Sequence, residues 1–153
     1  MIVQLREDEL SVCQILGRMR SLIARSSNVK DVKVGKQNGM EADVMGMIAE
    51  YAFAKQFNTF PDLGLTPRSG SYDGIYGEYR YDIKATSYKS GRLLSTLKIN
   101  PDVDIYILGI VDFDSVNFVG YALKSELIKE ENIKDLGSGK GYSLDQSQLR
   151  AFK

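Results

Sequence analysis

The chain has 153 residues, of which 43% are hydrophobic, and its 20 Lys and Arg residues balance its 20 Asp and Glu residues. This length fits one domain over residues 1–153, and the apolar content suffices for a buried core. The sequence contains no histidine and one cysteine, Cys13. These counts exclude Ser-His-Asp and Cys-His catalysis, histidine-ligated zinc and a disulfide framework. The remaining chemistry uses carboxylates, lysine, hydroxyls or a hard cation such as Mg²⁺ or Mn²⁺.

Two features of the sequence concern where the protein works. No apolar run approaches the length needed to cross a bilayer, and the N-terminus MIVQLREDEL becomes charged too early for a secretory signal. Basic residues gather within 17–38 and 80–98, which fits either solvated faces or a stripe that follows phosphates. We therefore expect a cytoplasmic protein without a membrane partner.

The first part of the chain predicts two helices. Residues 6–26 carry an apolar stripe at helical spacing, formed by Val12, Ile15, Leu16, Met19, Leu22 and Ile23. Cys13 flanks this stripe and is expected to be a small core residue. A polar link over 27–39 leads to a second helix over 40–58, and the prolines and glycines of 59–71 predict a loop.

A series of strands follows. We predict strands over 72–76, 79–86, 92–99, 104–112 and 116–122, with a hairpin turn at 113–115. A short helix over 124–131, a glycine-rich loop LGSGKGYS over 136–143 and a helical turn over 145–150 complete the chain. The order of helices, β-meander and small helices predicts an α/β fold, more narrowly an α+β sandwich. Its central mixed β-sheet would have about five strands flanked by helices.

The strand over 79–86 carries two charged residues among tyrosines and an isoleucine. Successive side chains of a strand alternate between its two faces. Asp82 and Lys84 therefore share one face, while Tyr81 and Ile83 share the other. Exposed strands often carry a polar face, so this pair indicates a functional site only together with the residues around it.

A predicted turn at Gly77-Glu78 brings a second carboxylate to this strand. Glycine at the first central position is typical of a type II′ hairpin turn. That register places Asp73 opposite Asp82, with Cβ atoms about 4.5–5.5 Å apart. Opposed like charges destabilise a hairpin, and a divalent cation between them would offset this effect. A one-residue slip of the register would separate the two side chains.

Glu50 lies on an apolar stripe of the second predicted helix, together with Gly46, Phe53 and Phe57. A carboxylate in such a place is costly unless it is paired or bound to a metal. Two interpretations stay open. Glu50 either edges the core and reaches water or a nearby lysine, or it belongs to a metal site.

Glu50 in GMIAEYAFAKQF, Asp73 in SYDG and Asp82 with Lys84 in YDIKAT together resemble the PD-(D/E)XK nuclease superfamily. The later segment DIYILGIVDFDSVNFVGYALKSELI is similar to the strand, hairpin, strand and short helix of phage-encoded members, and the resemblance spans roughly residues 40–150. Tyr72 stands where the motif has proline. The resemblance implies a restriction-endonuclease-like core and hydrolysis of DNA phosphodiester bonds in a bacterial host or phage-infected cell.

The resemblance also implies a role for each motif residue. Glu50, Asp73, Asp82 and Lys84 would be catalytic. Asp73, Asp82, the carbonyl group of Ile83 and Glu50 would hold Mg²⁺, with Mn²⁺ as a substitute. The metal would polarise the scissile phosphate and lower the pKa of a bound water, and Lys84 would position or help deprotonate that water. A homodimer is the economical way for so small a nuclease to cut both strands.

The candidates for DNA contact are Arg80, Tyr88, Lys89, Arg92 and Lys36. The three within 88–92 fit decoration of a hairpin turn equally well. The leading hypothesis is a Mg²⁺-dependent endonuclease, such as a phage homing, junction-resolving or recombination nuclease. The alternatives are a nuclease-fold protein that binds nucleic acid without cutting it, and a structural protein whose acids are solvated. GIY at 74–76 and GSGKG at 137–141 lack the further residues of a GIY-YIG nuclease and of a P-loop.

Overall fold

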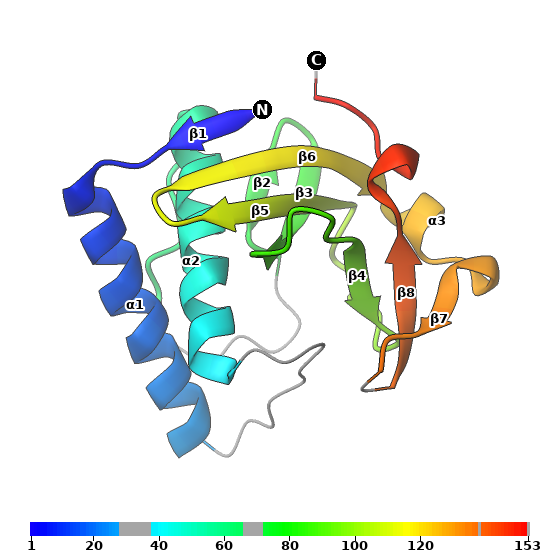
Figure 1. The fold of residues 1–153 in the computed structure, drawn as a ribbon, viewed down its shortest axis with the longest axis horizontal. Helices are drawn as coiled ribbons and strands as arrows, with labels where there is room; N and C mark the ends of the chain where they lie inside the picture. Colours follow the sequence, from blue (N-terminus) through cyan, green and yellow to red (C-terminus); the bar gives the residue numbers. More distant parts are fainter. Residues whose placement is uncertain (28–37, 66–71, 138, 153) are drawn as a thin grey trace.

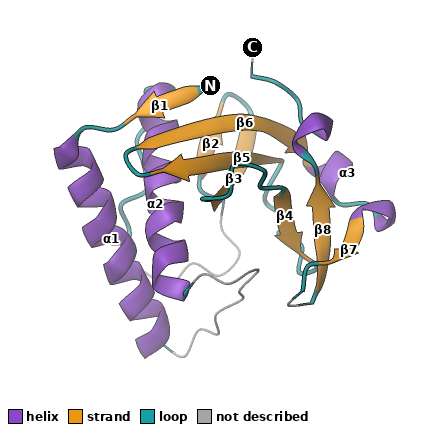
Figure 2. Ribbon diagram, in the orientation of Figure 1, coloured by secondary structure: helices purple, strands orange, loops and turns teal. Residues whose placement is uncertain are grey.

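The computed structural model describes residues 1–27, 38–65, 72–137 and 139–152. Two long helices lie on one side of a curved five-stranded sheet, and a smaller sheet lies on the other side (Figure 1, Figure 2). The predicted fold class, an α+β sandwich around a mixed sheet of five strands, is confirmed. Among the described residues, no helix is long and apolar enough to span a bilayer.

The elements follow one another along the chain with short connections. The helices are α1 (Glu7–Ser26), α2 (Gly39–Gln56) and α3 (Lys124–Leu127), and 3-10 turns lie at Glu130–Asn132 and Gln146–Gln148. The strands are β1 (Ile2–Gln4), β2 (Gly74–Tyr76), β3 (Tyr79–Thr86), β4 (Leu93–Thr96), β5 (Ile105–Asp112), β6 (Ser115–Leu123), β7 (Ile133–Asp135) and β8 (Lys140–Leu144). The predicted link 27–39 and loop 59–71 lie partly outside the described residues.

The larger sheet has the strand order β1-β6-β5-β3-β2. β3 and β5 run parallel, and the other neighbours pair antiparallel. The β2–β3 hairpin turns at Gly77-Glu78 with Tyr76 opposite Tyr79, as predicted. Gly77 has a φ of 60°, which only a residue without Cβ adopts readily and which suits the first central position of a type II′ turn.

The smaller sheet corrects several predictions. The strand predicted over 92–99 is β4, which leaves the larger sheet and pairs with β8 in the order β4-β8-β7. β8 forms within the segment predicted as a glycine-rich loop, because Tyr142 and Leu144 supply apolar side chains that its flanking glycines obscure. The predicted meander is also wrong, since β1 takes the fifth place in the larger sheet. The helix predicted over 124–131 ends at Leu127.

β5 is the centre of the molecule. Its residues 105–111 are all buried, which agrees with their almost continuous apolar sequence. Ile107 packs with Phe53 of α2 in the core between the larger sheet and the helices. Leu108 points to the opposite face and packs with Leu93 and Leu144 of the smaller sheet. The two cores therefore share one strand.

α2 lies against the sheet and α1 packs along α2 (Figure 1). The buried apolar and small residues of α1 are Leu10, Cys13, Gly17 and Ser21, so Cys13 is in the core as predicted. At Gly17 the two helices touch through their backbones, because an added Cβ would lie 2.6 Å from the Cα of Val44. Small side chains at this seam allow the close approach.

This seam leaves four of the six residues of the predicted apolar stripe exposed, while Leu16 packs against the core and Ile23 is half-buried. The side chains of Val12, Ile15, Met19 and Leu22 are between 42% and 58% exposed. Helical periodicity identified residues that share a face. It did not reveal that the opposite, small-residue face would meet α2.

We expect Gly17→Val to lower the free energy of unfolding by about 1–3 kcal/mol, because the new side chain must push the α2 backbone away. Gly46→Ala is the matched control. Gly46 is also helical, and an added Cβ there meets nothing within 4 Å. Its better helix propensity should raise stability by up to about 1 kcal/mol. Urea denaturation followed by circular dichroism measures both, and equal effects of the two substitutions would contradict the seam.

Candidate active site

β3 places Asp82 and Lys84 on one face of the larger sheet. Tyr81 and Ile83, on the alternate face, are buried in the core beneath α2. The Lys84 Nζ lies 2.8 Å from the Asp82 Oδ1, so the two side chains form an ion pair. Burial disfavours the charge of Lys84, but attraction and a hydrogen bond to Asp82 raise the pKa of Lys84 above its usual value. Lys84 is therefore protonated at neutral pH.

Asp73 precedes β2 and reaches the same strand by a different route from the predicted one. Its backbone N–H donates to the carbonyl of Tyr81 at 2.8 Å, which continues the hairpin. Its side-chain Oδ2 accepts a hydrogen bond of 2.7 Å from the backbone N–H of Ile83. The carboxylate is thus fixed next to the peptide between Asp82 and Ile83.

The carbonyl of Ile83 points to the same edge as Asp73. The N–H and C=O groups of one strand residue project to the same side, and the N–H of Ile83 donates to Asp73. Paired residues of β2 begin at Gly74, opposite Tyr81. The predicted carbonyl ligand therefore faces the β2 side of the strand, beyond the described pairs of β2, rather than β5.

The surroundings of Asp73 disfavour the ionised form of its carboxyl group. Burial raises the pKa of Asp73 well above its usual value, and the negative charges of Glu50 and Asp82 raise it further. The hydrogen bond from Ile83 and the charge of Lys84 act in the opposite direction. All four predicted catalytic residues thus influence one another through this carboxyl group.

Glu50 reaches the site from α2 and is held by α1. The Arg20 Nη1 lies 2.9 Å from the Glu50 Oε2, and both side chains are largely buried. The same guanidinium donates to the carbonyl of Gly64 at 2.9 Å and to that of Asp62 at 2.6 Å. A paired Glu50 was one of the two interpretations, but the partner is an arginine of another helix rather than a lysine.

Among the described residues, no three acidic or cysteine side chains stand together as a metal-binding group. Glu50 is turned to Arg20 and Asp82 to Lys84. The donor types nevertheless fit a hard cation, because Asp73, Asp82 and Glu50 are electrostatically coupled and the Ile83 carbonyl faces the same edge. Binding would require Asp82 and Glu50 to turn from their present partners.

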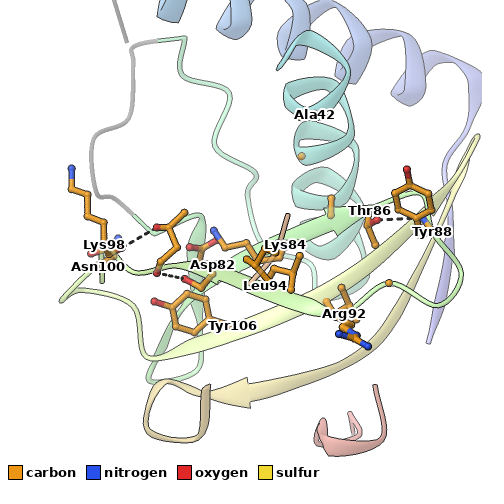
Figure 3. A pocket seen from close by; sticks show the side chains of 18 of the residues that line it. Ala42, Asp82, Lys84, Thr86, Tyr88, Arg92, Leu94, Lys98, Asn100 and Tyr106 are labelled. Atoms are coloured by element: carbon orange, nitrogen blue, oxygen red, sulfur yellow. Dashed lines mark hydrogen bonds and ion pairs between the residues drawn. The ribbon is translucent and has the colours of Figure 1, made fainter. Parts of the chain in front are cut away.

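An open cavity of about 610 Å³ adjoins this strand. Asp82, Lys84 and Leu94 lie near its middle in Figure 3, with Lys98 and Asn100 toward one end and Thr86 and Tyr88 toward the other. Its described lining also includes the small residues Ala42 and Gly46 of α2, and the hydroxyl side chains Ser90, Ser95 and Thr96. Among its described lining residues, Lys84, Arg92 and Lys98 are cationic and only Asp82 is acidic. Such a surface suits a polyanion.

The predicted DNA-contact residues separate into two groups. Tyr88 and Arg92 line the cavity, where Arg92 also pairs with Asp145 at 2.8 Å. Lys89 is exposed but is not among the lining residues. Arg80 faces elsewhere, because its guanidinium binds Asp104 with Nε–Oδ2 at 3.0 Å and also contacts Asp102. Hydrogen bonds from Arg80 lower the pKa of Asp104 to about 2. Lys36 lies outside the described residues.

Sequence reasoning missed two residues next to the motif. Arg20 was noted only as part of a basic segment, and nothing local indicates that it holds Glu50. Tyr106 lies beside Asp82 in the parallel β3–β5 register. Burial and the charge of Asp82 raise the pKa of the Tyr106 phenol. Strand parity would have found Tyr106 only if the pairing of β3 with β5 had been known.

The chain matches no protein-family model, no curated protein and no solved structure. The assignment of function therefore depends on the geometry of the site and on the residues that carry the resemblance.

The raised pKa of Asp73 predicts how stability depends on pH in the absence of metal. The folded state holds this proton more tightly than the unfolded state, so stability falls as pH rises from about 4, the pKa of an unfolded aspartate, through the higher folded pKa. Asp73→Asn should remove this loss, since an amide oxygen can still accept from Ile83. The variant should be more stable than the wild type at neutral pH, in melts recorded from pH 4 to pH 8.

The exposed carboxylate Asp112 supplies the control, as Asp112→Asn should leave the pH profile unchanged. A wild type and an Asp73→Asn variant with parallel profiles would show that Asp73 is not the strained group.

Proposed function

We propose that this protein is a Mg²⁺-dependent nuclease of the PD-(D/E)XK type that hydrolyses DNA phosphodiester bonds in the cytoplasm. The observation that carries the proposal is the hydrogen bond from the Ile83 N–H to Asp73. It brings the second carboxylate to the strand that displays Asp82 and Lys84, at the wall of an open cavity with three cationic lining residues. Glu50 acts electrostatically on the same carboxyl group.

Asp73, Asp82, Glu50 and the Ile83 carbonyl would hold the metal. When bound, Mg²⁺ supplies charge stabilisation at the phosphate and a more acidic water. Lys84 is protonated in the present geometry, so its role is to stabilise negative charge on the phosphoryl oxygens and to orient the attacking water, rather than to accept a proton. To hold the metal, Asp82 would have to turn from Lys84, which would leave the ammonium group of Lys84 to face the phosphate.

The cavity supports a nucleic-acid backbone as the substrate. Lys98 and Arg92 line it on either side of Lys84 (Figure 3), and hydroxyl and backbone groups occupy the spaces between the charges. A phosphodiester chain presents a charge at regular intervals.

We expect Lys84→Ala to reduce turnover by about 10²-fold or more and to change DNA affinity by less than about threefold, because the side chain serves mainly the transition state. Cleavage of plasmid, linear, single-stranded and branched DNA with and without Mg²⁺ gives the turnover, and fluorescence anisotropy gives the affinity. Lys89→Ala is the control, an exposed lysine outside the cavity lining. Metal-independent cleavage, or full activity in Lys84→Ala, would refute the proposal, whereas DNA binding without cleavage would favour the alternative of a silent nuclease fold.

Gly46 provides a test of the cavity that does not involve the metal. It costs α2 about 1 kcal/mol of helix propensity relative to alanine, although no described residue fills the space of its Cβ. A cavity wall without side chains lets a ligand backbone approach the helix closely. We expect Gly46→Gln to weaken DNA binding by about tenfold while the melting temperature stays the same or rises. Unchanged affinity would place the nucleic acid elsewhere.

A further inference from the structure

Tyr88 presents an aromatic ring at one end of the cavity (Figure 3). The residue is 57% exposed, so its ring contributes little to the core. The turn that carries it is nevertheless fixed, because the Gly91 N–H donates to the Tyr88 carbonyl at 2.8 Å. In addition, the Gln146 Nε2 donates to the carbonyls of Lys89 and Gly91 at 2.8 Å and 2.9 Å. A held backbone therefore displays an exposed ring, and a side chain of this kind gives a large contact area at low entropic cost.

The ring lies on the path that the cationic side chains define along the cavity. Lys98 and Arg92 lie on either side of Lys84 (Figure 3), so a phosphate chain that binds all three crosses the Asp82–Lys84 pair. Tyr88 follows Lys84 by four residues, which limits the separation of their Cα atoms to about 14 Å. Stacked nucleotides advance about 3.4 Å each along a strand. The ring therefore meets a base within a few nucleotides of the phosphate at Lys84.

An aromatic ring in this place serves an unpaired base. In a duplex the faces of the bases are stacked on one another, whereas in a single strand each base can stack on a side chain. The size of the cavity favours the same substrate. About 610 Å³ is the volume of a pocket for one drug-sized molecule, which is comparable with one or two nucleotides rather than with paired strands. The Asp82 and Lys84 side chains are recessed in its wall, at 17% and 37% exposure.

We propose that the cavity binds a single-stranded segment of DNA, with one base stacked on the ring of Tyr88 and phosphates beside Lys98, Lys84 and Arg92. The inference rests on the proposed function for the chemical nature of the ligand, and it adds the form of the substrate, which is an unpaired strand rather than an intact duplex. A duplex would give Tyr88 another role, in which its hydroxyl donates to a phosphate. The two roles use different atoms of one side chain, so substitutions can separate them.

Fluorescence anisotropy without metal measures binding apart from cleavage. The probes are a labelled single strand of about 12 nucleotides and the matching duplex, and the wild type should bind the single strand about tenfold more tightly or better. Tyr88→Leu should weaken single-strand binding about tenfold, the loss of one stacked base, while Tyr88→Phe keeps the ring and should retain most of the affinity. Tyr79→Leu is the matched control, because Tyr79 is a 50% exposed tyrosine of β3 outside the described cavity lining.

A strand without bases tests the stacking contact itself. A probe of the same length made of abasic residues keeps every phosphate and removes every base. Tyr88→Leu should bind this probe as tightly as the wild type does, because the ring and the base share one interaction and either loss removes it. On the strand that carries bases, the same substitution should cost about tenfold. This comparison does not depend on the register in which the strand lies.

Circular dichroism verifies that each variant folds. Equal binding of duplex and single strand, or a Tyr88→Leu variant that binds like the wild type, overturns the inference. A Tyr88→Phe variant as weak as Tyr88→Leu assigns the effect to the hydroxyl and overturns the stacking. Preferential binding of duplex DNA together with its metal-dependent cleavage overturns this inference and leaves the nuclease proposal in place. Single-strand binding through Tyr88 without cleavage overturns the nuclease alone, and a chain that binds neither form overturns both.

Discussion

The parallel pairing of β3 with β5 is the constraint on which both the core and the candidate site depend. Its register sets Asp82 beside Tyr106 and Lys84 beside Leu108. β5 is buried on both faces, so β3 cannot slip by one residue without turning Tyr81 away from α2. The alternation that buries Tyr81 also displays the charged pair in the cavity wall. Packing of the core therefore orients the groups that would perform the chemistry.

Around β3, two of the three acids form ion pairs, and the ionisation of the third, Asp73, is disfavoured by its surroundings. Asp82 is neutralised by Lys84, and Glu50 by Arg20. Asp73 is held by a backbone amide and is subject to the repulsion of both other acids, which its raised pKa expresses. A proton relieves this strain in the metal-free protein, and a cation would relieve it in a site of the proposed kind. The ion pairs hold Glu50 and Asp82 close by without forcing all three carboxylates together.

The packing of α1 differs from that of an ordinary amphipathic helix, because small residues form much of its inner face and several bulky apolar residues are exposed. Small residues at its inner face let its backbone touch that of α2 at Gly17, and Lys55 of α2 reaches the buried Glu9 at 2.6 Å. Close approach, this ion pair and the apolar side chains of Leu10 and Leu16 hold the helix. Four further apolar side chains stay exposed on its outer face, while Arg20 on the same helix extends to Glu50. α1 thus contributes to the candidate site through Arg20, from a helix that its seam with α2 fixes in place.

Local rules in the sequence determined much of this protein. Helical periodicity located α1 and α2, the Gly77-Glu78 turn set the β2–β3 register, and strand parity assigned Asp82 and Lys84 to one face. Each depends on residues within a few positions of one another. Tertiary structure alone decided that β4 joins β8, that Arg20 pairs with Glu50 and that most of the apolar stripe of α1 faces outward. These outcomes depend on which distant surfaces fit together most closely, and periodicity cannot report the identity of the surface that a given face will meet.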